Sequence, residues 1–365
     1  MNIVYISNSS IPSKHANAVH VMKMAQAFSD NGQDTTLISK YGDKNISINV
    51  SDYEFYGVKN NFNIIKLPWI KKIGSVTYSI ISLFEIIKLK PDFVYGRSLI
   101  AIYFSSLVGY KTMYEAHAPS YEENIIKRFF FKKLIAHKNF KNLVVISDAL
   151  KNIFLDTEKL TKEDIFVAHD GSDIVGLEEK INLSSNNKLQ VGYVGHLYKG
   201  RGIDIIIELS NILNDIDFHV VGGNTSDINY WKSQVKNDNI VFHGHVAPSE
   251  VYKYRNSFDI LLAPYQNKVS IEGKNDTSKF MSPLKIFEYM SSKKAIISSD
   301  LPVLREILDE NNSILVKCND VQSWVFAIDK LREAENRKIL SNNAYEDFKS
   351  KYTWKIRANN ILKRF

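Results

Sequence analysis

The sequence predicts an α/β protein made of two Rossmann-like βαβ domains with a cleft between them. Short apolar runs alternate with helical patterns along the whole 365-residue chain, an alternation typical of parallel sheets with crossover helices. A polar stretch at residues 176–188 interrupts this alternation, which then restarts. Because ligands in such folds bind at the carboxyl ends of the strands, we expect the functional site in the cleft.

The polar stretch sets the predicted domain boundaries. We expect an N-terminal domain over residues 1–175, a linker over 176–188 and a C-terminal domain over 189–350. A chain of this length has room for about two domains and a sizeable core. The basic tail, residues 351–365, has a helical pattern, and we expect it to pack back onto the N-terminal domain.

Short apolar runs predict the strands of the first half, and one segment between them has a clear helical pattern. Five apolar residues recur there at helical spacing, and Gly32 ends the helix; they are Ala18, Val21, Met22, Ala25 and Phe28. The predicted strands are Ile3–Ser7, Thr35–Ser39, Asn63–Leu67, Phe93–Gly96, Thr112–Ala116, Leu143–Ser147 and Ile165–Ala168.

The second half repeats the same alternation after the polar stretch. Its predicted strands are Leu189–Gly195, Phe218–Gly222, Ile240–Gly244, Asp259–Pro264, Ala295–Ser299 and Ser313–Val316.

Composition narrows the class of protein. The net charge of +7 and the pI of about 9.0 indicate an anionic partner, such as a phosphorylated substrate, a membrane surface or nucleic acid. The lone Cys318 excludes an intramolecular disulfide and a multi-cysteine metal cluster. The first residues, 1–6, have the pattern of a strand and not of a signal peptide. No apolar run approaches the roughly 18 residues of a membrane helix, so we expect a cytoplasmic protein.

The segment from Ser282 to Met290 is a candidate anion site. Ser282 is a good helix N-cap and Pro283 is favoured at the first helical position, where free N–H groups attract anions. Lys285 and Glu288 are three residues apart and share one helix face. A phosphate at the helix tip and a hydroxylated group near Glu288 are what a nucleotide-sugar presents. The alternative is a capped helix whose Glu faces solvent.

A second candidate site is the glycine-rich segment 195–202, which follows a predicted strand and opens a helix. Glycines let the backbone approach a ligand closely, and Lys199 and Arg201 can neutralise phosphate charge. The segment lacks the glycine spacing of the dinucleotide fingerprint. The alternative is a glycine-rich turn with two surface cations.

Together these segments resemble the retaining GT-B glycosyltransferases, in particular glycosyltransferase family 4 (group 1), over essentially the whole chain. The second half carries the resemblance best, in the order Val194–Gly200, Phe242–Gly244, Asp259–Pro264, Ser282–Met290 and Ala295–Ser299. The first half adds Ile11–Ser13, Ala16–Ala18, Glu115–His117 and Asp170–Asp173.

The resemblance implies roles for single residues. Glu288 matches the Glu that holds the ribose hydroxyls, Lys199 matches a Lys that contacts the diphosphate, and His117 matches a His beside the reacting sugar. The alternative for His117 is a sheet-edge histidine without chemistry. The implied catalytic residues are His117, Lys199 and Arg201. The implied nucleotide-sugar-binding residues are Gly195, His196, Lys199, Arg201, Ser282, Pro283, Leu284, Lys285 and Glu288, and the implied acceptor-side loop contains Ser13, Ala16 and Asn17.

Two positions depart from the family pattern. The family pairs two glutamates separated by seven residues, and Phe280 stands where the first of them belongs. Glu272 is a nearby carboxylate, but its spacing is wrong. His196 stands where the family often has Arg, and we expect Arg201 to take over that charge. These departures leave the identity of the donor sugar open.

We expect the transfer to be metal-independent and to need no cofactor. The leaving diphosphate would be stabilised by Lys199, Arg201 and the helix N-terminus at Ser282. The segment Asp215–Asp217 has the spelling of a metal-binding Asp-x-Asp motif, but it precedes a predicted strand at the amino end, so we interpret it as a solvated turn. No pair of carboxylates like that of retaining hydrolases is evident, and the resemblance implies front-face retaining transfer.

The resemblance implies a glycosyltransferase that moves a sugar from a UDP- or GDP-sugar to a glycan or lipid-linked acceptor of a cell-surface polysaccharide, such as lipopolysaccharide or capsule. Two alternatives are a GT-B nucleotide-sugar epimerase and a weakly catalytic binding protein of the same fold. Nucleic-acid binding is disfavoured, since the basic residues belong to no readout motif.

A basic and aromatic stretch, Lys127–Lys133, indicates a further partner. His137, Lys138 and Lys141 extend it, and Trp69–Lys72 has a similar character. Basic residues interleaved with aromatics suit an anionic membrane surface, which predicts a peripheral location on the inner face of the plasma membrane. The alternative is an amphipathic helix whose Phe side packs inward.

Overall fold

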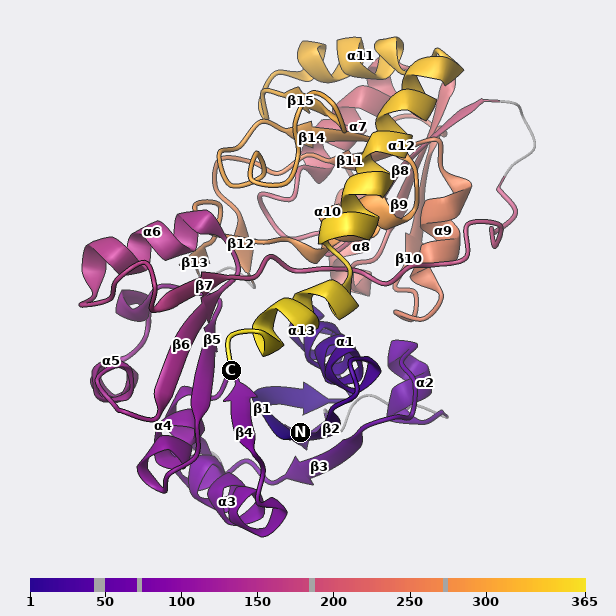
Figure 1. Ribbon diagram of the computed structural model, residues 1–365. Helices are drawn as coiled ribbons and strands as arrows, with labels where there is room; N and C mark the ends of the chain where they lie inside the picture. Colours follow the sequence, from indigo (N-terminus) through magenta and orange to yellow (C-terminus); the bar gives the residue numbers. More distant parts are fainter. Residues whose placement is uncertain (43–49, 71–73, 184–187, 272–274) are drawn as a thin grey trace. The chain divides into compact units, whose positions relative to one another are not determined.

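The computed structural model describes residues 1–42, 50–70, 74–183, 188–271 and 275–365. They divide into two compact units, labelled by element in Figure 1. Unit 1 consists of Met1–Asp170 together with Trp354–Phe365, and unit 2 is Gly171–Thr353. The described part of the stretch 176–188 therefore belongs to unit 2. Each unit is an α/β fold with a parallel sheet of its own.

The sheet of unit 1 has seven parallel strands in the order β3-β2-β1-β4-β5-β6-β7. The strand order changes direction between β1 and β4, and the carboxyl ends of strands at such a switch point form a ligand-binding crevice. Most residues of β1, β4 and β5 are buried, as expected for strands covered by helices on both faces. The strands are β1 Asn2–Ile11, β2 Asp34–Tyr41, β3 Asn63–Leu67, β4 Phe93–Gly96, β5 Thr112–Ala116, β6 Phe140–Val145 and β7 Ile165–Val167.

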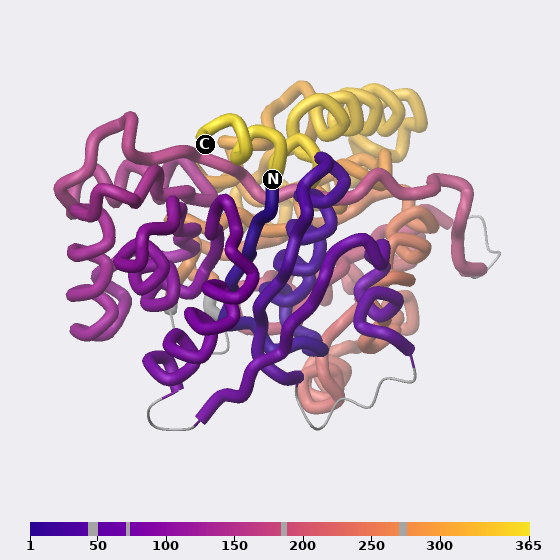
Figure 2. Tube along the Cα trace, turned by 60° about the horizontal axis from the view of Figure 1, so that its bottom comes forward, coloured from indigo at the N-terminus to yellow at the C-terminus, as the bar shows by residue number. Residues whose placement is uncertain are grey.

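The helices of unit 1 cover this sheet. The apolar residues predicted at helical spacing lie in α1 and are buried, and Gly32 follows the helix with a φ of +78°. α3, α4 and α5 pack in a row, and the C-terminal α13 packs against α1 (Figures 1 and 2). The helices are α1 Ala16–Asp30, α2 Asp52–Tyr56, α3 Gly74–Leu89, α4 Leu99–Leu107, the 3-10 turn η1 Ser120–Glu122, α5 Ile125–Ile135, α6 Asp148–Thr157 and α13 Trp354–Leu362.

The main sheet of unit 2 has six parallel strands in the order β10-β9-β8-β11-β14-β15, with its switch point between β8 and β11. A short antiparallel ladder of β12 and β13 lies outside it. The strands are β8 Leu189–Val194, β9 Ile216–Val221, β10 Ile240–Gly244, β11 Ile260–Ala263, β12 Ser270–Ile271, β13 Asn275–Asp276, β14 Ala295–Ser299 and β15 Ile314–Val316.

The core of unit 2 forms where helices bury aliphatic side chains against this sheet. Ile206 and Leu209 from α7 and Trp324 from α11 lie in one cluster with strand residues such as Phe218 and Ile297. The helices are α7 Ile203–Ile212, α8 Thr225–Lys232, α9 Val251–Ser257, α10 Leu284–Ser291, α11 Val321–Lys330 and α12 Ala334–Lys351. None of the helices in the described ranges of either unit has the length and apolarity that crossing a membrane requires.

All predicted strands are present, and they differ from the prediction mainly at their ends. The largest differences are in β1, which continues to Ile11, and in β6, which runs from Phe140 to Val145 and stops before Ser147. Ser147 instead caps α6, because its hydroxyl accepts a hydrogen bond from the backbone N–H of Leu150. Lys351, predicted as the start of the tail helix, is the last residue of α12.

Candidate active site

In unit 2 the candidate site lies at the switch point, where β8 ends in Val194 and β11 ends in Ala263. Gly195 follows β8 with a φ of +149°. A Cβ atom at this position would lie 2.9 Å from Cε of Lys285. The positive φ favours glycine here, and the loop passes close to the end of the Lys285 side chain.

The loop then returns to the sheet and opens α7 at Gly202, whose φ is +78°. A Cβ atom on Gly202 would lie 2.0 Å from the carbonyl oxygen of Pro264, so this close approach also requires glycine. The turn places the Arg201 guanidinium 5.3 Å from the ring centroid of Tyr265. Arg201 Nε is buried and has no hydrogen-bond partner among the described residues. The prediction that this segment follows a strand and opens a helix is confirmed.

Lys285 is the central residue of this site. Its side chain is buried, with Nζ 3.5 Å from the ring centroid of Tyr193 and 5.2 Å from that of Tyr265. Burial lowers the pKa of Lys285 well below its ordinary value, the Arg201 charge lowers it further, and Glu288 acts in the opposite direction. We call Tyr193, Arg201, Tyr265 and Lys285 the Lys285 cluster. Two cations held this close, one of them buried, favour an anion beside them.

The start of α10 corrects the prediction made for Ser282. The helix begins at Leu284, and its N-cap is Pro283, whose φ of −76° and ψ of 119° are extended. Ser282 therefore lies one residue before the cap, and Pro283 is not the first helical residue. Pro283 itself makes no side-chain capping hydrogen bond. The first N–H groups of α10, beginning with Leu284, still point out of the helix and remain suited to an anion.

Glu288 lies further along α10 and is partly exposed. Its carboxylate is 3.5 Å from Nη1 of Arg255, a buried residue of α9 that also donates from Nε to the Ser292 hydroxyl at 3.1 Å. Arg255 orients the Glu288 carboxylate, whose oxygens can accept hydrogen bonds from hydroxyl groups of a ligand.

The remaining predicted residues of unit 2 lie around these groups. The His196 ring stacks on Tyr198 with a centroid distance of 4.9 Å, and its carbonyl accepts a 2.6 Å hydrogen bond from the Tyr193 hydroxyl. Lys199 is exposed. Phe280, at the position of the missing acid, is buried and only 3% exposed. Glu272 lies outside the described residues.

In unit 1 a buried polar network lies at the carboxyl end of β5. Glu115 Oε1 is 2.5 Å from His117 Nε2 and 3.2 Å from Arg357 Nη2, and Glu115 Oε2 accepts a short hydrogen bond from the Tyr95 hydroxyl. His20 Nε2 lies 3.3 Å from Glu115 Oε1. We call His20, Arg97, Glu115, His117 and Arg357 the Glu115 cluster.

Electrostatics set the charge state of this cluster. Burial alone would raise the pKa of Glu115, but the charges of Arg357 and His20 outweigh it and hold the pKa well below its ordinary value. Burial and the Arg97 charge lower the pKa of His117 to about 4. His117 is therefore neutral at pH 7. Because the Glu115 carboxylate can only accept, His117 carries its proton on Nε2, and its Nδ1 is a hydrogen-bond acceptor.

His20, Glu115 and His117 are also near enough to each other to hold a metal ion. Their surroundings do not favour one. Arg97 Nη1 is 3.1 Å from His20 Nδ1, and Arg357 pairs with the same Glu115 oxygen that the ion would need. A second buried carboxylate, Asp170, lies 3.3 Å from His20 Nε2 and 3.9 Å from Arg357 Nη2. The guanidinium groups of Arg97 and Arg357 already balance the two carboxylates, so we interpret the cluster as a fixed hydrogen-bond network.

The predicted acceptor-side loop follows β1. Ser13 is buried, where its N–H donates to the Tyr56 hydroxyl at 2.6 Å and its carbonyl accepts from the same hydroxyl at 2.7 Å. Ala16 and Asn17 are exposed in the first turn of α1. The structure thus places Ser13 in a supporting position and leaves Ala16 and Asn17 accessible.

The interpretation of Asp215–Asp217 as a solvated turn is wrong for one of the two carboxylates. Asp217 lies within β9, is buried and accepts a hydrogen bond from Gln190 Nε2 at 3.3 Å. Asp215 is exposed, and Arg332 donates to it at 2.6 Å. Both lie at the amino end of the sheet, as predicted, whereas the Lys285 cluster follows the carboxyl ends of β8 and β11.

Several residues of these clusters were not identified from the sequence. His20, Arg97 and Arg357 join the Glu115 cluster, and Tyr193, Arg255 and Tyr265 surround Lys285 and Glu288. One signal was available: a Glu that ends an apolar strand, as Glu115 does, is buried and must find a cation. Nothing in the sequence indicates that the cation is Arg357.

The comparison with protein families applies to unit 2. Residues 188–334 match the family model of the group 1 glycosyl transferases. Among curated proteins, the uncharacterised glycosyltransferase MJ1069 of Methanocaldococcus jannaschii is 28% identical over 254 residues, 65% of this chain and 62% of the relative. The alpha-galactosylglucosyldiacylglycerol synthase of Streptococcus pneumoniae is 26% identical over 210 residues, 53% of this chain and 52% of the relative. The chain thus spans under two thirds of either relative.

Solved structures show the fold of the whole chain. A sucrose-phosphate synthase from Thermosynechococcus elongatus matches with a TM-score of 0.74 and 13% identity, covering 99% of this chain and 97% of that one. HepE of Anabaena, in complex with UDP and glucose, matches with a TM-score of 0.73 and 13% identity, covering 99% and 98%. The fold is GT-B. The family match of residues 188–334 supports a group 1 glycosyltransferase.

Proposed function

We propose that this protein is a retaining glycosyltransferase that moves a sugar from a nucleotide-sugar, a UDP- or GDP-sugar, to a glycan or lipid-linked acceptor of a cell-surface polysaccharide. The observation that carries the proposal is the buried Lys285 ammonium, which lies with Arg201 under the Gly195 loop at the switch point of unit 2. The match to the group 1 glycosyl transferase model, the relative MJ1069, which is named a glycosyltransferase, and the structure of HepE with UDP support it.

The Lys285 cluster fits the chemistry of the leaving group. Breaking the anomeric bond leaves a nucleoside diphosphate, whose developing charge must be stabilised. Lys285 and Arg201 supply fixed positive charge, and the N–H groups at the start of α10 supply donors. Lys199 is exposed, and we assign it to the outer phosphate. These groups supply the stabilisation without a metal, and the reaction needs no cofactor. Glu288, held by Arg255, would bind the ribose hydroxyls.

The Glu115 cluster has the hydrogen-bonding geometry to orient a sugar. Neutral His117 offers Nδ1 as an acceptor while its Nε2 is held by Glu115. An acceptor of this kind can orient a sugar hydroxyl without adding a positive charge beside a developing oxocarbenium ion. In a front-face transfer, the proton of the acceptor hydroxyl goes to the departing phosphate oxygen, so His117 need not act as a base.

The test is binding of nucleotide-sugars to a Glu288→Ala variant. A thermal-shift screen over UDP-, GDP-, ADP- and CMP-sugars should find one donor class that stabilises the wild-type protein, because a bound ligand raises stability by mass action. Glu288→Ala should weaken that donor by about tenfold, since a hydrogen bond to a charged group is lost. Glu208→Ala removes an exposed Glu of α7 as a matched control. Unchanged affinity in Glu288→Ala would overturn the assignment of the site.

The reaction type is tested with the same donor. Acceptor-dependent product with the donor's anomeric configuration, read by proton NMR, supports retaining transfer. Interconversion of donor sugars without an acceptor would instead indicate a nucleotide-sugar epimerase. Binding without turnover under any acceptor would indicate a binding protein of the same fold.

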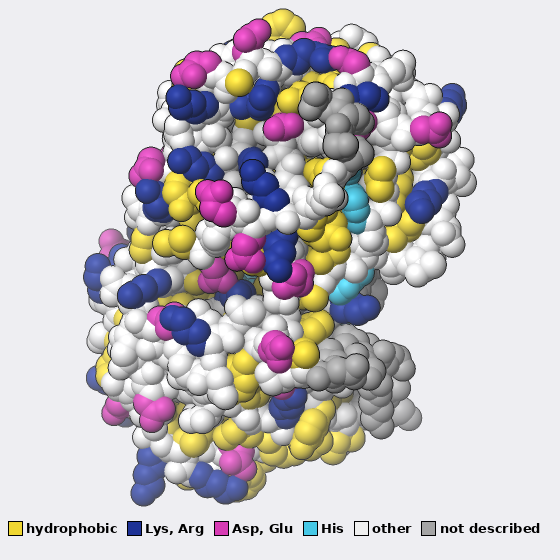
Figure 3. All heavy atoms as spheres, turned by 90° about the vertical axis from the view of Figure 1, so that its right-hand side faces the viewer, with side chains coloured by type: hydrophobic (Ala, Val, Ile, Leu, Met, Phe, Trp, Pro, Cys, Tyr) yellow, Lys and Arg dark blue, Asp and Glu magenta, His cyan; other side chains and the backbone are white. Residues whose placement is uncertain are grey.

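The proposal that a membrane surface is a partner is based on exposed apolar side chains of α3 and α5, two helices of the row α3–α5. Val76, Ile80, Phe84 and Ile87 are exposed and follow one face of α3, with Phe84 62% exposed. On α5, Ile125, Ile126 and Phe129 are exposed, whereas Phe131 is buried. A helix that packed its whole apolar face inward would expose fewer apolar side chains. Figure 3 shows hydrophobic side chains next to Lys and Arg along the lower edge of unit 1. Lys71 and Lys72 lie outside the described residues.

Charge favours an anionic lipid as the occupant of this surface. α5 carries four cations and no carboxylate; the cations are Lys127, Arg128, Lys132 and Lys133. Exposed apolar side chains among cations bind at the interface of an anionic bilayer. The double variant Ile125→Asp with Phe129→Asp should abolish sedimentation with anionic vesicles at low salt. Phe326→Asp alters an exposed Phe of unit 2 and should have no effect. No binding of the wild-type protein would contradict this part of the proposal.

A further inference from the structure

A pocket of about 390 Å³ lies in unit 2 at the amino ends of β11 and β14. This is the opposite edge of the sheet from the Lys285 cluster, because the strands are parallel. The lining comes from the residues just before these strands and from the first half of α12. The volume is within the range of small-molecule sites. The residues that line it are Asp259, Lys293, Lys294, Ala295, Arg337, Lys338, Ser341 and Asn342.

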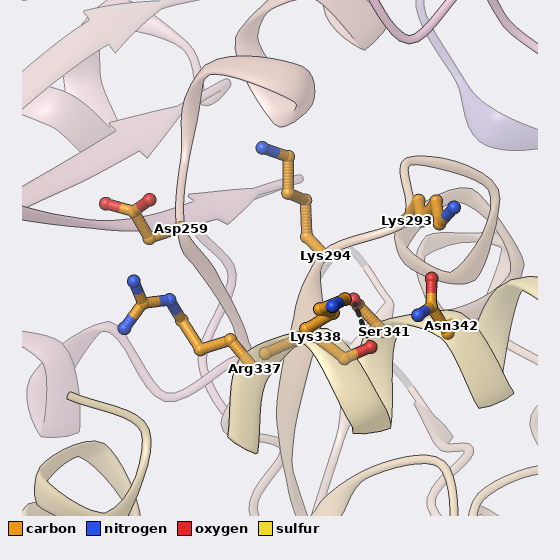
Figure 4. Close-up of a pocket in the computed structure, with 8 residues that line it drawn as sticks. Asp259, Lys293, Lys294, Arg337, Lys338, Ser341 and Asn342 are labelled. Carbon is orange, nitrogen blue, oxygen red and sulfur yellow. Dashed lines mark hydrogen bonds between the residues drawn. The ribbon is translucent and has the colours of Figure 1, made fainter. Parts of the chain in front are cut away.

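The lining is strongly basic, with four cations and one carboxylate. The carboxylate, Asp259, is already engaged, since it accepts a 2.9 Å hydrogen bond from the backbone N–H of Gln190. Figure 4 shows Arg337 extending toward Asp259, with Lys294 reaching up between Asp259 and Lys293. Lys293 points away from this group. The open part of the pocket is therefore faced mainly by Lys294 and Arg337. Lys338 is exposed at its rim, where its Nζ lies 3.8 Å from the exposed Glu335 carboxylate.

Lys294 is the cation of the lining whose charge has the fewest compensating contacts. Among the described residues, none accepts a hydrogen bond from its ammonium or forms a salt bridge with it. Burial lowers its pKa, and the charges of Lys180 and Arg337 lower it further, while Asp259 acts in the opposite direction. A cation in such a position is electrostatically strained, and a bound anion would relieve the strain.

Hydrogen bonds to the backbone fix the side chain of Arg337. Its Nη1 donates to the carbonyl oxygens of Leu331 and Arg332, at 2.6 and 2.7 Å, at the end of α11. The guanidinium is thus fixed before any ligand arrives, which lowers the entropic cost of binding. Ser341 and Asn342 add neutral polar groups at the same wall.

We propose that this pocket is a second anion site, which binds a small ligand carrying a phosphate group between Lys294, Arg337 and Lys338. The site is separate from the proposed donor site, because the two lie at opposite edges of one sheet. α10 connects the two regions: it starts at the Lys285 cluster and ends just before Lys293 and Lys294. Occupation of the pocket can therefore bear on the position of the donor helix.

The experiment is titration of the full chain with inorganic phosphate, compared with sodium chloride at equal ionic strength and followed by calorimetry. We expect saturable binding to the wild-type protein that is weakened roughly fivefold or more in Lys294→Gln and in Lys338→Gln. Lys349→Gln removes the same charge elsewhere on α12, where Lys349 pairs with Glu346 at 2.8 Å, and should bind phosphate like the wild type. Circular dichroism checks that each variant is folded.

A further variant separates this pocket from the proposed donor site. Lys199→Gln alters the proposed donor site and should leave the phosphate affinity of this second pocket unchanged, because Lys199 lies at the other edge of the sheet. Loss of binding in Lys199→Gln but not in Lys294→Gln would place the phosphate at the donor site and overturn the proposal. Equal weakening in all the variants, including Lys349→Gln, would reduce the effect to general surface charge and would overturn it as well, as would the absence of saturable binding.

Discussion

The carboxylate of Glu115 and the guanidinium of Arg357 lie 3.2 Å apart although 242 residues separate them in the sequence. Both side chains are buried, with Glu115 1% and Arg357 3% exposed. Arg357 also donates to the carbonyls of Ala168 and His169. The C-terminal helix α13 is therefore part of the candidate site of unit 1, because it supplies the charge that keeps Glu115 ionised.

Replacing Arg357 by Met should destabilise unit 1 by about 3–5 kcal/mol, because it leaves the Glu115 carboxylate buried without its main cation. Thermal unfolding should show the loss as a lower midpoint. Arg364→Met removes an arginine from the same C-terminal segment, where it lies over the Phe166 ring at 4.6 Å, and should cost far less. The double variant Glu115→Gln with Arg357→Met should be more stable than the sum of the single losses predicts. Additive losses would mean that the pair is not coupled.

The sequence predicts the sheets well and the polar clusters only in part, for a physical reason. Strands buried on both faces are near-continuous apolar runs, so β4, β5 and β14 could be located to the residue. Residues that follow strand ends, such as Gly195 and His117, could be found because the parallel fold collects strand ends at one edge.

What could not be predicted depends on long-range packing. Ser282 followed by Pro283 has the local signature of a helix start, but the extended ψ of Pro283 moves the start to Leu284. The burial of Lys285 results from Tyr193 and Tyr265, which are distant in sequence. A Lys beside a Glu on a helix has the pattern of a solvent-facing pair, and only the tertiary structure reveals a buried cation.

Replacing His117 by Ala should lower turnover about 10- to 100-fold and change donor affinity little, because His117 belongs to unit 1 and the proposed donor residues to unit 2. Since the pKa of His117 is about 4, its protonation should not affect turnover between pH 6 and 8, and the wild-type rate should fall only as the pH approaches 4. His117→Gln, which keeps a hydrogen-bond acceptor, should retain more activity than His117→Ala. A fully active His117→Ala enzyme would limit His117 to a structural role.

Stability should fall in mild acid because of a pair of histidines in unit 2, of which His219 is buried. His219 Nδ1 lies 3.0 Å from His243 Nε2, and His219 Nε2 donates to Gln190 Oε1 at 2.7 Å. Burial, and then the neighbouring His243, lower the pKa of His219 from 6.5 to about 4. The unfolded chain therefore binds a proton at a higher pH than the folded chain, so stability is lost as the pH falls from about 7 and the loss is complete near pH 4.

At about 1.4 kcal/mol per pH unit, this loss amounts to about 3 kcal/mol for His219. Thermal unfolding between pH 7.5 and 4.5 measures it. The variant His219→Gln should show a smaller fall of the midpoint with acid, even if it is less stable at pH 7.5. His15→Gln replaces an exposed histidine of unit 1 and should follow the wild type. The same acid dependence in His219→Gln and the wild type would show that other groups cause it.

Replacing Lys285 by Met should lower the affinity for nucleotides without lowering the stability of the fold. Lys285 is buried, and its ammonium has only aromatic rings and no salt bridge with any described carboxylate, so burying it costs free energy that a thioether of similar length does not cost. We expect Lys285→Met to leave the thermal midpoint unchanged or to raise it, while affinity for UDP or GDP falls about tenfold or more. Lys285→Arg is not conservative, because a planar guanidinium differs in shape and hydrogen-bond geometry from the compact ammonium. A Lys285→Met protein that loses stability and keeps its nucleotide affinity would show that the ammonium serves the fold through its contact with Tyr193, and would leave Arg201 and the start of α10 as the anion site.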